Sequence, residues 1–125
     1  MSMIRVLLVD DQPWVLRGLR MRLELEPDLE VVGEASDGDA ALELAGRLHP
    51  DVVLMDVAMP GRDGIAATRA LRASREPSQV VLLTLHDDCE TRARAQSSGA
   101  VAFVGKHEAS EILLQAIREA AQPSL

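Results

Sequence analysis

Residues 52–56 read Val-Val-Leu-Met-Asp, and this short stretch is the centre of the fold prediction. A run of apolar residues, β-branched at its start, is typical of a strand buried on both faces of a parallel sheet. The run ends in Asp56, and residues 59–64, Met-Pro-Gly-Arg-Asp-Gly, then predict a loop because they are rich in turn formers. A buried strand that delivers a carboxylate to a loop is the first indication of a functional edge.

Outward from this strand, strand patterns alternate with helix patterns along the whole chain. Further strands are predicted at residues 4–9, 29–35, 80–84 and 101–104. The strand at 29–35 is interrupted by two glutamates and is expected at a sheet edge. Helices are predicted at residues 12–25, 38–48 and 65–73, after residue 87, and in the closing segment. Strict alternation predicts an α/β fold with one doubly wound parallel sheet, covered by helices on both faces.

Two local details of the helices are also predicted. Val15, Leu19 and Leu23 recur every four residues, which predicts the core-facing side of the first helix. Asp87 with Glu90 resembles a capping box that begins the fourth helix.

Composition limits the kind of protein. The chain has 125 residues, a net charge of −7 and a single cysteine. The acidic balance argues against a nucleic-acid surface on this domain, because phosphate contacts are made mostly by Lys and Arg. The lone cysteine excludes an internal disulfide, and no apolar run approaches the roughly 20 residues of a membrane span. We expect a single domain in the cytoplasm, without a membrane segment.

Polar side chains follow four of the predicted strands. Asp10 and Asp11 follow the first, Asp56 ends the third, Thr84 ends the fourth and Lys106 comes after the fifth. Because the carboxyl ends of parallel strands share one edge, these side chains are expected to converge. Acids this close repel one another unless a cation lies between them, and oxygen ligands at an open site favour Mg²⁺. Alternatively, each acid is only a helix N-cap, which Asp11 before Gln12-Pro13 fits well.

The ordered set of motifs resembles the receiver domain of response regulators over essentially the whole chain. The motifs are Val9-Asp10-Asp11, Met55-Asp56, Met59-Pro60 with Gly64, Thr84, Gly99-Ala100 and Gly105-Lys106. The resemblance implies the flavodoxin-like (βα)5 fold with strand order 2-1-3-4-5. Segments such as Val31-Val32-Gly33-Glu34-Ala35 are similar to the narrower NarL/LuxR-like group.

The resemblance also implies a role for each site residue. Asp56 would accept the phosphoryl group, and Asp10, Asp11, Asp56 and the backbone carbonyl of Ala58 would hold Mg²⁺. Thr84 and Lys106 would contact the phosphoryl oxygens, and Phe103 would turn inward when Thr84 moves. The implied donor is a phosphohistidine on a sensor histidine kinase. The chain would catalyse only its own phosphorylation and dephosphorylation, and would not be an enzyme acting on other molecules.

The expected output lies outside this chain. Residues 1–121 are predicted to form the receiver, and 122–125 a tail or the start of a linker. Phosphorylation would promote a homodimer through one of two surfaces. One consists of the first and last helices, and Trp14, Met21 and Leu25 form a second apolar stripe on the first of them. The other consists of the fourth helix, the fifth strand and the fifth helix. A helix-turn-helix effector domain absent from this chain would bind DNA. His86 is a hypothesised modulator of the phosphoryl lifetime.

Two departures from the family pattern leave an alternative open. His107 stands where many receivers have proline, so the Lys106-His107 peptide is either strained cis or trans. Phe103 lacks the hydroxyl that tyrosine would offer to partners. A phosphorylation-independent pseudo-receiver is therefore the second hypothesis. A phosphatase acting on other molecules is disfavoured, because Ala58 stands where its general acid would be needed.

Overall fold

The computed structural model describes residues 3–85 and 88–122. These residues form one sheet of five parallel strands in the order β2-β1-β3-β4-β5, as predicted. The elements are β1 (Ile4–Val9), α1 (Pro13–Glu24), β2 (Leu29–Ala35), α2 (Gly38–Leu48), β3 (Val52–Asp56), α3 (Gly64–Ala73), β4 (Gln79–Thr84), α4 (Cys89–Ser97), β5 (Ala102–Gly105) and α5 (Ser110–Ala120). The glutamate-interrupted strand β2 lies at an edge, which confirms that prediction.

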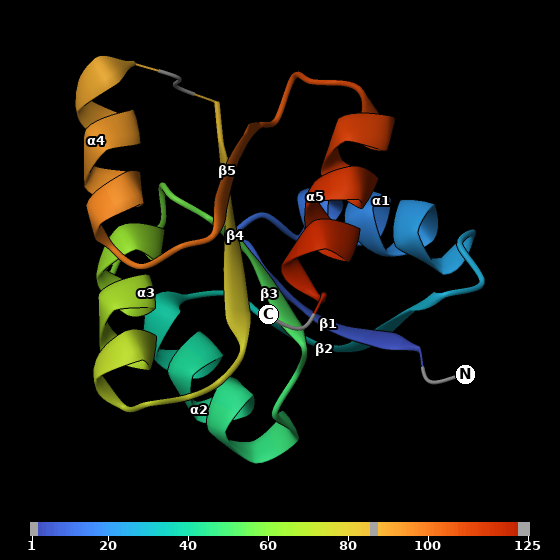
Figure 1. Ribbon diagram of the computed structural model, residues 1–125, viewed down its shortest axis with the longest axis horizontal. Helices are drawn as coiled ribbons and strands as arrows, with labels where there is room; N and C mark the ends of the chain where they lie inside the picture. Colours follow the sequence, from blue (N-terminus) through green and yellow to red (C-terminus); the bar gives the residue numbers. More distant parts are fainter. Residues whose placement is uncertain (1–2, 86–87, 123–125) are drawn as a thin grey trace.

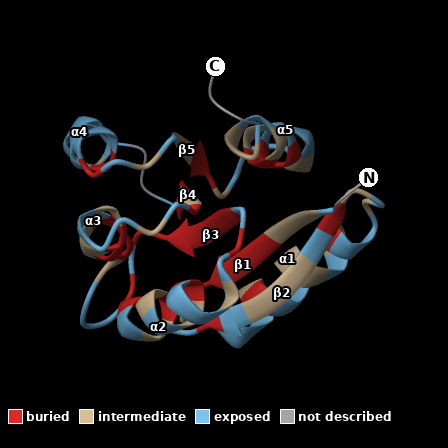
Figure 2. Cartoon of the chain, turned by 60° about the horizontal axis from the view of Figure 1, so that its bottom comes forward, coloured by how far each residue is buried: buried red, intermediate tan, exposed pale blue. Residues whose placement is uncertain are grey.

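The helices divide into two layers around the sheet. Figure 1 shows α1 and α5 on one side and α2, α3 and α4 on the other. A hydrophobic core lies on each face of the sheet, and successive residues of the central strands point alternately into the two cores. Val53 and Met55 face the α2/α3/α4 side, while Val52 and Leu54 face the α1/α5 side. β3 is buried throughout, as the continuous apolar run predicts (Figure 2). No helix in the described ranges is long and apolar enough to cross a bilayer.

One local prediction is confirmed in part and one is wrong. On α1 Leu23 is buried and Leu19 packs against the same core, as predicted, whereas Val15 is only partly buried and Leu16, outside the predicted stripe, is buried as well. The N-cap of α4 is Asp88 and not Asp87, which lies outside the described residues: the Asp88 carboxylate accepts a hydrogen bond from the Thr91 N–H at 2.7 Å. Gly99, with φ +100°, ends that helix in the left-handed conformation expected of glycine.

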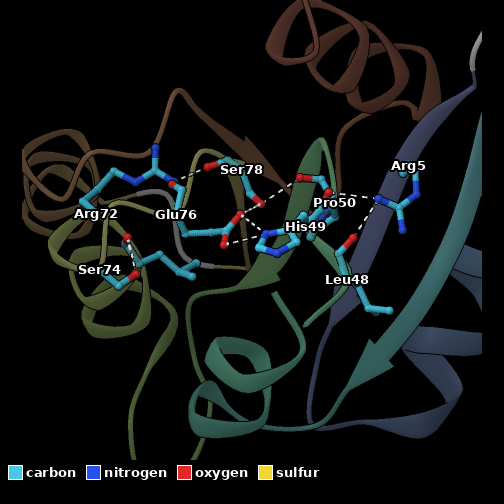
Figure 3. Close-up of polar contacts among 9 residues, drawn as sticks. Arg5, Leu48, His49, Pro50, Arg72, Ser74, Glu76 and Ser78 are labelled. Carbon is cyan, nitrogen blue, oxygen red and sulfur yellow. Dashed lines mark hydrogen bonds and ion pairs between the residues drawn. The ribbon is translucent and has the colours of Figure 1, made fainter. Parts of the chain in front are cut away.

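The edge of the sheet formed by the amino ends of the strands is closed by a polar network (Figure 3). The buried Ser78 hydroxyl donates to the Pro50 carbonyl at 2.7 Å, and Arg72 donates to the carbonyls of Glu76 and Ser78. Arg5 caps the end of α2 by donating to the carbonyls of Leu48 and His49 at 2.7 and 2.9 Å. These contacts stabilise the connections at this edge and leave the opposite edge for function.

A second network fastens α5 to the α1–β2 connection. Arg118 donates to Asp28 at 2.8 Å and to Glu26 at 2.7 Å, and Arg22 reaches Glu26 at 2.9 Å. Hydrogen bonds from Arg22 and Arg118 lower the pKa of Glu26, and the hydrogen bond from Arg118 lowers the pKa of Asp28. Ionised acids at both positions therefore favour the folded state.

This network predicts a pH-dependent effect of Arg118→Gln. Carboxyls with lowered pKa values contribute stability above their ordinary values and lose it as the pH falls through the lowered ones. We expect the variant to unfold more easily at pH 7, with the difference from the native chain shrinking below about pH 4. Chemical denaturation across this range measures it.

Arg47→Gln is the matched control for Arg118→Gln. Within the described part of the chain Arg47 pairs with Glu43 alone, at 3.6 Å in an exposed i,i+4 arrangement, and such pairs contribute little. An equal and pH-independent loss in both variants would contradict the prediction.

Candidate functional site

The predicted site residues meet at the carboxyl edge of the sheet. One carboxylate oxygen from each of Asp10, Asp11 and Asp56 lies within 4.8 Å of the others. Asp10 and Asp56 are buried, while Asp11 is partly exposed. Parallel pairing explains the convergence, because β1 and β3 are hydrogen-bonded neighbours in which Val9, the last residue of β1, lies opposite Met55, the residue before Asp56.

The acids of the cluster are not helix N-caps. Gln12 occupies the N-cap position of α1 and makes no side-chain cap bond. Asp10 accepts a hydrogen bond from the Gln12 N–H at 3.0 Å, and Asp56 accepts one from the Ala58 N–H at 3.3 Å. The capping acids are Asp37, Asp63 and Asp88. Helix capping therefore does not explain the clustering of these acids.

Lys106 supplies the countercharge of the cluster. Its Nζ lies 2.9 Å from Asp10 Oδ2 and 3.3 Å from Asp56 Oδ2. The lysine follows β5, and its backbone N–H donates to the Thr84 carbonyl at 2.7 Å, which fixes the loop to the end of β4. The Lys106 side chain therefore links the end of β5 to the ends of β3 and β1.

Burial and the neighbouring charges act against each other at Asp56 and Lys106. Burial raises the pKa of Asp56, with the Asp10 charge acting in the same direction and Lys106 opposing both. Burial alone would lower the pKa of Lys106, but its hydrogen bond to Asp10 and the nearby carboxylates outweigh burial, so the pKa of Lys106 is raised. A charged lysine beside closely spaced acids is consistent with a site built to receive further charged groups.

A groove of about 540 Å³ leads from Asp56 along the space between α1 and α5. Asp56 follows Leu54 by two residues along β3, so both side chains face the α1/α5 side. The lining residues include Trp14, Leu19, Leu85, Lys106 and Leu113. Trp14 is 66% exposed and Leu85 is also 66% exposed, so the walls of the groove are accessible apolar surface beside the carboxylate.

The remaining predicted residues lie around this centre. Thr84 is buried at the end of β4, and Ala58 is exposed beside Asp56 in the groove. Phe103 is partly buried against the α2/α3/α4 core. No cis peptide bond occurs in the described part of the chain, so the Lys106-His107 peptide is trans. His86 lies outside the described residues, and its proposed role stays a prediction.

Sequence reasoning missed two features of the site. The groove depends on how α1 and α5 are spaced, which no local pattern encodes. Arg92 of α4 lies over the Phe103 ring, with its guanidinium carbon 5.2 Å from the ring centroid. Helical spacing does not reveal this contact, since it joins α4 to β5.

Comparison with known proteins agrees with this geometry. The response regulator receiver domain model matches residues 6–118. The chain therefore belongs to the response regulator receiver domain family.

Its similar relatives are of the NarL/LuxR type. The chain is 41% identical over 120 residues to the nitrate/nitrite response regulator protein NarP of Escherichia coli (strain K12), covering 96% of this chain and 56% of NarP. The same identity, over 120 residues, relates it to the transcriptional regulatory protein LiaR of Bacillus subtilis (strain 168), covering 96% of this chain and 57% of LiaR. The chain thus spans about half the length of the curated relatives it matches.

Solved structures support the same family. The signal receiver domain of NarL from Mycobacterium tuberculosis has a TM-score of 0.94 at 35% identity, covering 99% of this chain and 100% of that one. A LuxR-family two-component response regulator from Aurantimonas sp. SI85-9A1 has a TM-score of 0.91 at 36% identity, covering 96% of this chain and 86% of that one.

The clustered acids predict that a divalent ion stabilises the fold. Since the pKa of Asp56 is raised, its contribution to stability is present below its ordinary pKa and is lost as the pH rises through the raised value. At pH 7 without divalent ions, Asp56→Asn should therefore raise the melting temperature. Mg²⁺ should stabilise the native chain by about 2.7 kcal/mol at a hundredfold excess over its Kd, and the variant by much less.

Thermal melts with and without MgCl₂ measure both effects. Asp39→Asn is the matched control, because Asp39 is 76% exposed and pairs with Arg62 outside the cluster. A Mg²⁺ response that is equal in the native chain, Asp56→Asn and Asp39→Asn would contradict metal binding by the cluster.

Proposed function

We propose that this chain is a phosphorylation-controlled switch in which Asp56 accepts a phosphoryl group. The observation that carries the proposal is the grouping of Asp56 with Asp10 and Asp11, neutralised in part by Lys106 at 2.9 and 3.3 Å. Carboxylates act as nucleophiles in aspartyl-phosphate chemistry when nearby cations offset the charge that gathers on the transferred group.

Each site residue has a different role in the proposed phosphotransfer. A carboxylate oxygen of Asp56 attacks phosphorus, the bond from phosphorus to the donor atom breaks, and the donor keeps the electron pair. Lys106 exchanges its contact with Asp56 for one with a phosphoryl oxygen, and the Thr84 hydroxyl donates to another. Mg²⁺ held by Asp10, Asp11, Asp56 and the Ala58 carbonyl would supply the main countercharge.

The donor in this proposal is a phosphohistidine on a sensor histidine kinase. The groove beside Asp56 supports it, since a partner that delivers a phosphoryl group needs accessible surface next to the carboxylate. The reaction is self-phosphorylation followed by autodephosphorylation. Ala58 offers no side-chain acid or base, which disfavours an enzyme acting on other molecules. This activity belongs in the cytoplasm.

The output follows from a shift between two pre-existing conformations. Thr84 moves toward the phosphoryl group, Phe103 turns inward, and the surface formed by α4, β5 and α5 or by α1 and α5 becomes able to bind a second copy. Transcription would be controlled by a DNA-binding domain outside this chain. The NarL/LuxR type of the relatives supports this part of the proposal.

Intact mass after incubation with acetyl phosphate tests the proposal directly. With Mg²⁺ the native chain should gain one phosphoryl group, and without Mg²⁺ or in Asp56→Asn it should gain none. Asp39→Asn, which neutralises an exposed acid elsewhere, should behave as the native chain does. If neither acetyl phosphate nor any histidine kinase phosphorylates the native chain, the pseudo-receiver becomes the better hypothesis.

Phosphorylation should also change hydrogen exchange in α4. Only Ala95 of this helix is buried, so few contacts hold it against β5. We expect its amides to change exchange rate by about fivefold or more on phosphorylation, the lower end of typical coupling between sites. Helix α2, fastened at its end by Arg5, should change little. Identical exchange of α4 in both forms would contradict its role in the switch.

A further inference from the structure

The contact between Arg92 and Phe103 links the least buried helix to the sheet. The Arg92 guanidinium carbon lies 5.2 Å from the centroid of the Phe103 ring, within the range of a cation–π interaction. Phe103 belongs to β5, whereas Arg92 belongs to α4. Only Ala95 of α4 is buried, so this contact is one of the side-chain contacts that relate the position of α4 to β5.

The sheet register places Phe103 on the same side as Thr84. Phe103 pairs with Leu82 on the neighbouring strand, and both pack into the α2/α3/α4 core. Thr84 follows Leu82 by two residues, so its side chain shares that face of β4. The Phe103 ring therefore has Arg92 on its α4 side and the sheet, with Thr84 farther along, on the other.

We propose that Arg92 is a positioning residue that holds Phe103 in the unphosphorylated arrangement and thereby opposes the switch. The proposal rests on the phosphorylation of Asp56 proposed above. A ring that moves inward toward Thr84 leaves the guanidinium, so the contact stabilises one of the two conformations only. A contact made in one conformation shifts the equilibrium by its own differential free energy.

Linkage then predicts the effect on the phosphoryl site. Removing a contact that favours the unswitched form must increase affinity for any ligand that favours the switched form. An exposed cation–π contact corresponds to a factor of about two to five in an equilibrium constant. The sign is diagnostic, since loss of a positive charge by itself weakens the binding of an anion.

Arg94 provides a matched control on the same helix. Its guanidinium contacts Asp63, the N-cap residue of α3, at 3.4 Å. Arg94→Gln therefore removes the same charge from α4 without removing the Phe103 contact. Arg92→Lys keeps the charge but loses the planar group that stacks on a ring, so it should fall between native and Arg92→Gln.

The chain offers a single-site probe because Phe103 is its one phenylalanine and it has no tyrosine. Incorporating 4-fluorophenylalanine gives one ¹⁹F resonance, which is followed while the Mg²⁺-loaded protein is titrated with beryllofluoride, a phosphoryl mimic. We expect the midpoint to fall about two- to fivefold in Arg92→Gln, less in Arg92→Lys, and to rise or stay unchanged in Arg94→Gln.

Three results would overturn the inference alone. One is a midpoint in Arg92→Gln that equals or exceeds the native value, and another is an equal decrease in Arg94→Gln. The third is a native ¹⁹F resonance that stays unshifted although intact mass shows phosphorylated Asp56, which would leave the proposed function standing. A native chain that neither gains mass from any donor nor responds to beryllofluoride would overturn the proposed function and this inference together.

Discussion

The ion pairs of Lys106 with Asp10 and Asp56 are the interaction on which the rest of the site depends. Two buried carboxylates and the nearby Asp11 would repel one another without a countercharge. Lys106, which follows the edge strand β5, supplies that charge. Its ammonium lies 2.9 Å from Asp10 and 3.3 Å from Asp56. The ammonium thus neutralises the two buried acids in part within the folded chain.

The two ends of the strands carry different kinds of polar groups. At the amino ends, Ser78, Arg72 and Arg5 satisfy backbone carbonyls and close the connections (Figure 3). At the carboxyl ends, charged groups crowd together and a groove remains open. Helix α4 buries one residue, Ala95, and its other contacts include Arg92 with Phe103 and Arg94 with Asp63. One end of the strands is thus closed by hydrogen bonds, and the other gathers charge beside an open groove.

Most of the architecture follows from local pattern, and the errors have identifiable causes. Buried strands such as β1 and β3 are recognisable because continuous apolar runs have few other structural uses. The predicted stripe of α1 omitted Leu16 because several apolar stripes were available, and only packing against the sheet buries Leu16 together with Leu23. The α4 cap was mispredicted by one residue because adjacent aspartates are equally suitable caps, and only the backbone geometry distinguishes them.

The sequence by itself determined the parallel α/β fold and the carboxylates, hydroxyl and ammonium that its carboxyl edge gathers. Those residues stand directly after strands, and strand ends meet wherever the sheet is parallel. Only the tertiary structure decided that Lys106 bridges Asp10 and Asp56, that a groove opens between α1 and α5, and that Arg92 covers Phe103. Each of these joins elements far apart in the chain, so it depends on side-chain reach and helix spacing, which no local pattern encodes.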